Sequence, residues 1–274
     1  DPMRFSLSDF LTTEEKTNPS FWKYSAAIDA TTADVLQEEL HKAKDMDVDE
    51  YIKTPIDHQV YIPGSSLKGA FRTALAYSAF RADENLFEEL KKRLEQVDWR
   101  WSDEAVNDLI FRGARRDPKY DLFKILRFSD SSPLPANEET LEIGKMKILS
   151  TASSRKKEAP KQGTMYKQLQ QLNLHASSTR SPMKPWWTIQ EVLQSGVAFA
   201  GEVTLEDDLL KNPHAQKILR WRKPHQMNFS LEQLVKAANT FSIDICNWEQ
   251  RFFEKYVEGI DVKPILGFYR DLKK

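Results

Sequence analysis

The sequence predicts a fold of the α+β class, and two observations support that prediction. Apolar residues recur at spacings of three and four in some segments and alternate with polar residues in others, so both helices and strands are expected. These segments follow one another without the regular strand–helix–strand order of a parallel sheet, and the chain contains no internal repeat. Its 274 residues suffice for one large domain or two small ones, with a core that needs no disulfide or metal.

Four segments have the pattern of helices. The second of them carries its apolar side chains on one face, and the last has Ser230 at its start with Gln233 three positions on, a capping-box arrangement. The expected helices cover residues 32–44, 66–82, 85–97 and 230–257.

Four shorter segments have the pattern of strands. The first ends at Pro63-Gly64 and the second is followed by Ser-Asp-Ser-Ser-Pro, and both sequences are turn signals. The last alternates apolar and polar side chains, as a strand with one buried face does. The expected strands cover residues 59–62, 122–128, 146–149 and 196–205. Residues 150–185 are rich in Ser, Thr, Lys and Gln and show little periodicity.

The composition excludes several classes of protein. No apolar run approaches the roughly 18 residues of a membrane span, so no membrane partner is expected. The single cysteine, Cys246, excludes an internal disulfide and a paired-cysteine zinc site. The N-terminus lacks the apolar region of a signal peptide, and the mean hydropathy is −0.59, so a cytoplasmic protein is expected.

The charge is unevenly distributed along the chain. Residues 1–62 carry 6 basic and 13 acidic side chains, whereas residues 145–187 carry 9 basic and 1 acidic. A basic segment of this kind is either a solvated loop or a contact for a polyanion, because clustered Lys and Arg gain affinity by releasing phosphate counterions. The candidate contacts in it are Lys156, Lys157, Lys161, Arg180 and Lys184.

Residues 62–72, here called the signature segment, join a strand to a helix through glycine and two hydroxyls. The amides at a helix start and the positive end of its dipole favour an anion. Lys68 and Arg72, four positions apart, would lie on one face, and Gly69 would let a ligand approach the backbone. The alternative is a turn with a serine N-cap. The candidate anion contacts are Gly64, Ser65, Ser66, Lys68, Gly69 and Arg72.

Three kinds of enzyme are alternatives to a binding site: a nucleotide-binding P-loop protein, a Ser-x-x-Lys acyl enzyme and a metal-dependent or acid–base nuclease. The signature segment lacks the terminal Gly-Lys-Ser/Thr of a nucleotide-binding P-loop, which excludes that class. Ser65 and Lys68 match the Ser-x-x-Lys spacing of acyl enzymes, although the partner motifs of those enzymes are absent. The five histidines are scattered, so no metal site or cofactor is expected, and Asp130 is expected to cap a turn.

The signature segment resembles that of the RAMP superfamily of CRISPR proteins. Two further stretches agree in order and spacing: residues 121–131 resemble the strand after the signature helices, and residues 191–205 resemble the strand that follows the thumb. The resemblance covers about residues 59–205. It implies a ferredoxin-like, RRM-related α+β fold, with residues 1–274 forming one domain, an acidic helical insertion at 28–58 and a flexible basic thumb-like insertion at 145–187.

Within this superfamily the sequence is most similar to the subunit of the type III-A (Csm) effector complex that caps the crRNA 3′ end. The resemblance implies a non-catalytic crRNA-binding subunit that contributes to crRNA maturation and antiviral defence. Its implied partners are crRNA, other RAMP subunits, small helical subunits and target RNA. The signature segment would hold phosphates, the thumb would lie along the RNA, and Trp186-Trp187 would either stack on a base or enter the core.

Two alternatives within the superfamily stay open at this point. One is a RAMP subunit of a type III-B (Cmr) complex. The other is a crRNA-processing endoribonuclease, for which His58, close to the signature segment, would be the reactive group.

Overall fold

The computed structural model describes residues 18, 22–41, 48–112, 117–149, 183–221, 226 and 229–256. These residues form two compact units. The first falls within Asp1–Ile62, Ser131–Ile148 and Pro185–Ala200, and the second within Pro63–Asp130, Leu149–Lys184 and Gly201–Lys274. The first unit contains the predicted insertion at 28–58 and both ends of the predicted insertion at 145–187. The single-domain organisation stays a prediction.

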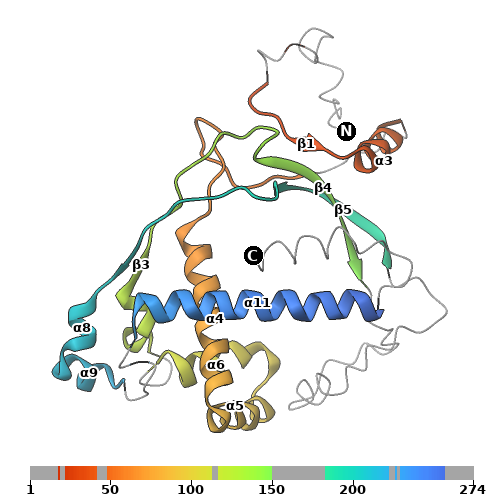
Figure 1. Cartoon of the computed structure of the whole chain (residues 1–274). Helices are drawn as coiled ribbons and strands as arrows, with labels where there is room; N and C mark the ends of the chain where they lie inside the picture. The colour runs from red at the N-terminus through yellow and green to blue at the C-terminus, as the bar shows by residue number, and fades with distance from the viewer. Residues whose placement is uncertain are drawn as a thin grey trace, which may run out of the picture. The chain divides into compact units, whose positions relative to one another are not determined.

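The first unit is built on a four-stranded sheet in the order β1-β4-β5-β2 (Figure 1). Its strands are β1 (Ala27–Ile28), β2 (Val48–Asp49), β4 (Leu141–Leu149) and β5 (Met183–Leu193). The short edge strands pair in parallel, β1 with β4 and β2 with β5. The Gln194 amide donates to the Thr140 carbonyl at 3.0 Å, so the end of β5 lies beside the start of β4 and these two long strands run antiparallel.

Helix α3 (Ala30–His41) connects the two edge strands of this sheet. Its start is capped by Asp29, whose carboxylate accepts the backbone N–H of Thr32 at 3.0 Å and the hydroxyl of the same residue. These hydrogen bonds, the side-chain one first, lower the pKa of Asp29. The helix predicted at 32–44 is therefore confirmed, with its start two residues earlier.

A buried ion pair ties the chain before the signature segment to β5. Lys53 Nζ contacts the Glu191 carboxylate, and the two side chains are 5% and 3% exposed. The Tyr51 amide donates to the same carboxylate at 2.8 Å, and the Tyr24 ring lies 4.1 Å from Lys53 Nζ. Such a pair persists in a low-dielectric interior because each charge has both a counterion and hydrogen bonds.

The second unit is mainly helical. It contains α4 (Gly64–Ala82), α5 (Glu84–Gln96), α6 (Ser102–Ile110), α8 (Asp207–Lys211), α9 (Pro213–Leu219) and α11 (Leu231–Tyr256). It also contains the 3-10 turns η2 (Trp99–Trp101), η3 (Pro118–Tyr120) and η4 (Leu122–Ile125), and the antiparallel strands β3 (Leu126–Phe128) and β6 (Val203–Leu205). Figure 1 shows the long α11 crossing α4, and the two helices are in contact.

The core of the second unit collects apolar side chains from its α-helices, from η4 and from strands β3 and β6. Leu75 of α4, Leu109 of α6 and Leu234 of α11 belong to it, together with the edge-to-face pair of Phe111 and Phe123. A polar contact fixes the helix crossing: the Tyr77 hydroxyl donates to Asp244 at 3.0 Å, and Arg81 pairs with the same carboxylate.

The three predicted helices in this unit are confirmed within two residues at their ends. The predicted cap of the last one is present, because the Gln233 amide donates to the Ser230 hydroxyl at 3.2 Å. Helix α4 begins at Gly64, ahead of the predicted Ser66. Among the described residues no helix is both long and apolar enough to cross a membrane.

The predicted strands are only partly right. Residues 146–149 lie in β4, as expected, but residues 122–125 form η4 because the Asp121 carboxylate accepts the Phe123 amide at 2.9 Å and starts a 3-10 turn. Of residues 196–205 only Val203–Leu205 is a strand, and Gly196 adopts a turn with φ of 88°. Residues 59–62 are extended and pair only through isolated bridges at Val60.

Candidate nucleic-acid interface

The N-terminus of α4 is seated against the end of β3. A Cβ at Gly64 would lie 2.4 Å from the Phe128 carbonyl oxygen and 2.7 Å from that of Ser129, so only glycine fits there. The Gly64 amide donates to Asp130 Oδ1 at 2.7 Å. The sequence predicted that Asp130 caps its own turn, whereas its carboxylate accepts the first amide of α4, 66 residues away, and so occupies one donor of the predicted anion site.

The residues after Gly64 in α4 expose small and hydroxyl-bearing side chains to solvent. Ser65, Ser66 and Gly69 are exposed, and a Cβ added at Gly69 would meet nothing within 4 Å. The Ser66 and Leu67 amides donate to the Pro63 carbonyl, whereas the Ser65 amide has no acceptor in the described part of the chain. This face, the α4 face defined by Ser65, Ser66 and Gly69, offers two hydroxyls, one free amide and bare backbone to a ligand.

Lys68 points toward the protein. Its ammonium donates to the Leu126 carbonyl at 2.8 Å, and partial burial lowers the pKa of this lysine. The other two N–H groups of the ammonium can still donate to a bound anion. Partial burial makes the charged form of this lysine less favourable than it would be in water.

Arg72 is occupied by partners from the same unit. Its guanidinium makes a two-pronged contact to Asp121, at 3.0 and 2.6 Å, and donates twice to Asn107 Oδ1, at 3.1 and 2.8 Å. It also lies 4.0 Å from the centroid of the Phe111 ring. Four of the five N–H groups are thus used inside the fold, so the geometry gives Arg72 a structural role. Its predicted contact with RNA phosphate stays a prediction.

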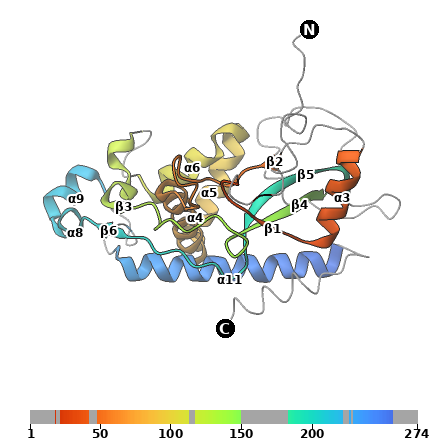
Figure 2. The ribbon, with the colours of Figure 1, turned by 90° about the horizontal axis from the view of Figure 1, so that it is seen from above.

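The ends of the basic insertion are the strands β4 and β5, which lie side by side in Figure 2. Trp187 is half-buried and shares a sheet face with the buried Ile189, and Lys145 Nζ lies 4.9 Å from its ring centroid. This position fits the expected alternative in which the tryptophan enters the fold. Lys184 lies in β5, whereas Lys156, Lys157, Lys161 and Arg180 are outside the described residues.

Within the described residues, the side chains that the enzyme alternatives would need are not brought together. No group of three or more His, Cys, Asp or Glu side chains there could hold a metal ion. His58 is half-buried in a tight turn with φ of 49°, and its nearest aromatic partner is Tyr24, with ring centroids 6.2 Å apart. Lys68 donates to the Leu126 carbonyl, and no hydrogen bond joins it to Ser65 in the described part of the chain.

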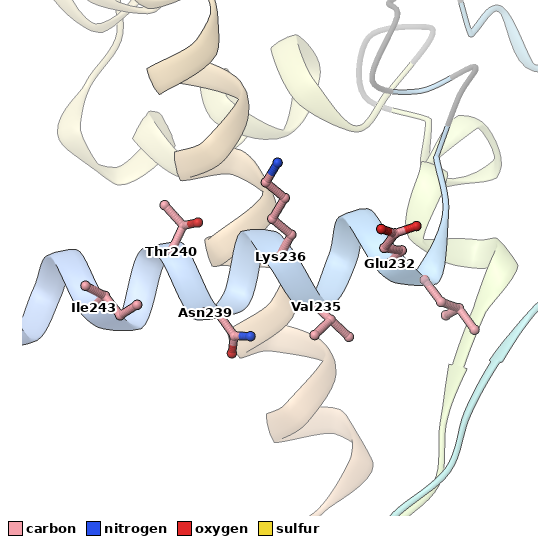
Figure 3. A pocket seen from close by; sticks show the side chains of 7 residues that line it. Glu232, Val235, Lys236, Asn239, Thr240 and Ile243 are labelled. Atoms are coloured by element: carbon pink, nitrogen blue, oxygen red, sulfur yellow. The ribbon is translucent and has the colours of Figure 1, made fainter. Parts of the chain in front are cut away.

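An open hollow of about 540 Å³ lies along the outer face of α11 (Figure 3). Its lining is largely apolar and comes from one helix, with Glu232 and Lys236 as its charged side chains. Lys236 is the one cation in this lining, which provides no cluster of phosphate-binding groups. The α4 face is therefore the better candidate for the functional site.

A comparison with protein-family models now identifies the class of protein. The model of the RAMP superfamily matches residues 49–262, which is most of the chain, and the chain belongs to this superfamily. No curated protein sequence matches it.

Two solved structures share its fold. One is the crystal structure of T. onnurineus Csm5, with 17% identity and a TM-score of 0.54 over 99% of this chain and 75% of that chain. The other is a chain in the cryo-EM structure of a Csm–crRNA–target RNA ternary complex of a type III-A CRISPR-Cas system, with 19% identity and a TM-score of 0.53. The match covers 85% of this chain and 59% of that chain, so the present chain spans about three-fifths of the length of that relative.

Proposed function

We propose that this chain is a non-catalytic crRNA-binding subunit of a type III-A effector complex, in which it caps the crRNA 3′ end and contributes to crRNA maturation. The observation that carries the proposal is the α4 face. In a member of the RAMP superfamily, the signature segment presents two hydroxyls, a free amide and a glycine with open space above it. These groups suit the phosphate–sugar backbone, which needs no sequence readout.

The fold likeness to Csm5 and to a chain of a Csm–crRNA–target RNA complex supports this role over that of a type III-B subunit. The proposed partners are crRNA and the neighbouring RAMP and small helical subunits, with target RNA passing nearby. The absence of catalysis is part of the proposal, and it predicts that the purified chain leaves repeat RNA intact. Cleavage that is lost in His58→Ala would contradict it.

The test is a comparison of effector complexes purified with the wild-type chain and with Ser65→Glu/Ser66→Glu. Both serines are exposed, and a carboxylate in the first turn of a helix is compatible with its dipole, so the variant should fold. Ser242→Glu on the exposed side of α11 is the matched control. The proposal predicts that only the double variant loses crRNA from this subunit and yields heterogeneous crRNA 3′ ends. Wild-type RNA content and 3′ ends in the double variant would overturn it.

A further inference from the structure

The fold of the second unit brings together two basic regions that are about 100 residues apart in the sequence. The Trp221 indole N–H donates to the Tyr120 carbonyl at 2.7 Å, and the Gln226 side-chain amide donates to the Ile110 carbonyl at 2.9 Å. Trp221 and Gln226 are both buried. These contacts fix the chain after α9 against the chain around η3. Figures 1 and 2 both show α8 and α9 near β3, which follows η4 directly.

Cations gather around Tyr120 at this junction. Lys119 Nζ lies 4.7 Å and the Arg220 guanidinium 5.5 Å from the centroid of its ring. Arg220 ends α9 in the left-handed conformation, with φ of 58°. Lys124 is an exposed residue of η4, the turn that follows η3 after one residue. Lys217 lies one turn before Arg220, whose amide donates to the Lys217 carbonyl at 3.3 Å. The set is called the Tyr120 surface: Lys119, Tyr120, Lys124, Lys217 and Arg220.

The charges of this surface are mostly not neutralised. Elsewhere in the second unit, the exposed cations Arg81, Arg100 and Arg127 each pair with a carboxylate. Lys119 pairs with Asp117 at 2.9 Å, but Lys124, Lys217 and Arg220 have no carboxylate partner among the described residues. All three are exposed. A compact group of free cations attracts a polyanion, because bound phosphates release their condensed counterions.

We infer that the Tyr120 surface is a second contact for the phosphate backbone of single-stranded RNA, separate from the α4 face. The hydrogen bonds of Trp221 to Tyr120 and of Gln226 to Ile110 hold the backbone beside these cations in place, which lowers the ordering cost of binding. The Tyr120 ring restricts the Arg220 and Lys119 side chains further. The inference rests on the proposed RNA-binding function and adds a contact that the signature segment does not supply.

The test measures binding of the full chain to a labelled single-stranded RNA between 50 and 200 mM salt. The variant is Lys124→Gln/Arg220→Asn, in which asparagine is chosen because it tolerates the left-handed backbone at position 220. The matched control is Lys92→Gln/Lys236→Gln, which removes two exposed lysines from α5 and α11 that have no ion-pair partner in the described part of the chain. Thermal unfolding of all three proteins verifies that each folds.

A single strand loses about 0.7 in the log–log salt slope per phosphate contact. The slope of Lys124→Gln/Arg220→Asn should therefore be shallower than that of wild type by about 1.4. Between 50 and 200 mM salt, the affinity of wild type should then fall by a factor about seven times larger than the affinity of the variant. The control should keep the wild-type slope. Equal slopes in all three proteins, or equal losses in both variants, would overturn the inference alone.

Two further outcomes are distinguishable. A wild-type chain that binds no RNA would overturn the proposed function together with this inference. A variant that keeps the wild-type slope but is lost from the assembled complex would show that the surface binds an acidic protein segment instead of RNA, and would also overturn it.

Discussion

The two glycines of the signature segment have opposite surroundings. Gly64 is enclosed by the backbone carbonyls of Phe128 and Ser129, whereas the space beside Gly69 is open. The first glycine therefore allows close packing of α4 on β3. The second lowers the intrinsic stability of the helix by about 0.5–1 kcal/mol relative to alanine without a packing benefit inside this unit. Under the proposed function, this glycine lets RNA approach the helix backbone.

Gly69→Ala should raise the stability of the fold and weaken its binding to RNA. The free energy of unfolding should rise by about 0.5–1 kcal/mol, because the new methyl group touches nothing and the helix gains propensity. RNA affinity should fall about fivefold, equivalent to about 1 kcal/mol for one displaced backbone contact. Urea unfolding and RNA titration measure the two quantities. Gly64→Ala is the control and should destabilise by about 1–3 kcal/mol through overpacking. Unchanged affinity in Gly69→Ala would place the RNA elsewhere.

Arg72→Ala should act on stability. The substitution leaves Asp121 and Asn107 without their donor, and we expect a loss of about 2–4 kcal/mol in the free energy of unfolding, because the pair is only partly exposed. Arg72→Lys should recover little, since an ammonium cannot make the two-pronged contact. Urea denaturation measures both. Wild-type stability combined with lost RNA affinity would instead make Arg72 a phosphate ligand, as the sequence predicts.

The sequence could not reveal the partners of Lys68 and Arg72. Their spacing correctly places them on one α4 face, but Leu126 and Asp121 are 58 and 49 residues away, and no local pattern links them. The same holds for Asp130, because the sequence predicts a local turn cap and the carboxylate instead accepts the Gly64 amide, 66 residues away.

At the scale of the elements, strand β5 is held in the first unit both by strand pairing and by a buried ion pair. It pairs with β4 and β2, and its Glu191 holds the buried ammonium of Lys53. Burial by itself opposes the charge on Lys53, but hydrogen bonds to Glu191 and Tyr24 outweigh that penalty and raise the pKa of the lysine. The pair thereby fastens residues 50–53 to the strand that leads out of the basic insertion.

Breaking this pair should cost more than replacing it. Glu191→Gln removes the buried counterion of Lys53 and leaves only the exposed Glu50 carboxylate, 3.6 Å from the ammonium, so we expect a loss of about 3 kcal/mol. Lys53→Met/Glu191→Leu removes both charges and should lie much closer to wild type, because replacing a buried ion pair with apolar side chains is often neutral. Urea unfolding of both variants tests this. A double variant as unstable as Glu191→Gln would contradict the account.

The pH dependence of this unit should be visible at alkaline pH. Burial raises the pKa values of Tyr24 and Tyr51 above their ordinary value of 10.0. The folded state therefore keeps these protons longer than the unfolded chain does. The resulting stability is present below pH 10 and is lost as the pH rises through the folded pKa values. The urea midpoint should fall between pH 9 and 11, and the fall should be smaller in Tyr24→Phe/Tyr51→Phe. Identical falls in both proteins would refute the assignment.

Helices were easier to predict than strands in this chain. In α4, α5 and α11 a sustained spacing of three and four identifies the buried face, and the local cap at Ser230 marks a boundary. The strands depend on partners from distant segments, such as β3 with β6. A short apolar run such as residues 122–125 has no pattern of its own to distinguish a strand from a 3-10 turn.

At the scale of the whole molecule, the RAMP superfamily match over residues 49–262 includes parts of both compact units. The acidic side chains concentrate in residues 1–62, and the free cations of the Tyr120 surface lie in the second unit. The α+β class and the superfamily could be predicted from the sequence, because they depend on local patterns and on the signature segment. The two-unit division could not, since it depends on contacts between segments far apart in the chain.

The most direct measurement is site-specific crosslinking in a reconstituted effector complex that carries 4-thiouridine near either the 3′ or the 5′ end of the crRNA. Mass spectrometry then identifies the protein and the peptide joined to each probe. The account predicts that the 3′ probe crosslinks to this chain, within the first turns of α4, and that the 5′ probe does not. Crosslinks to this chain from the 5′ probe alone, or none while other subunits react with both probes, would contradict it.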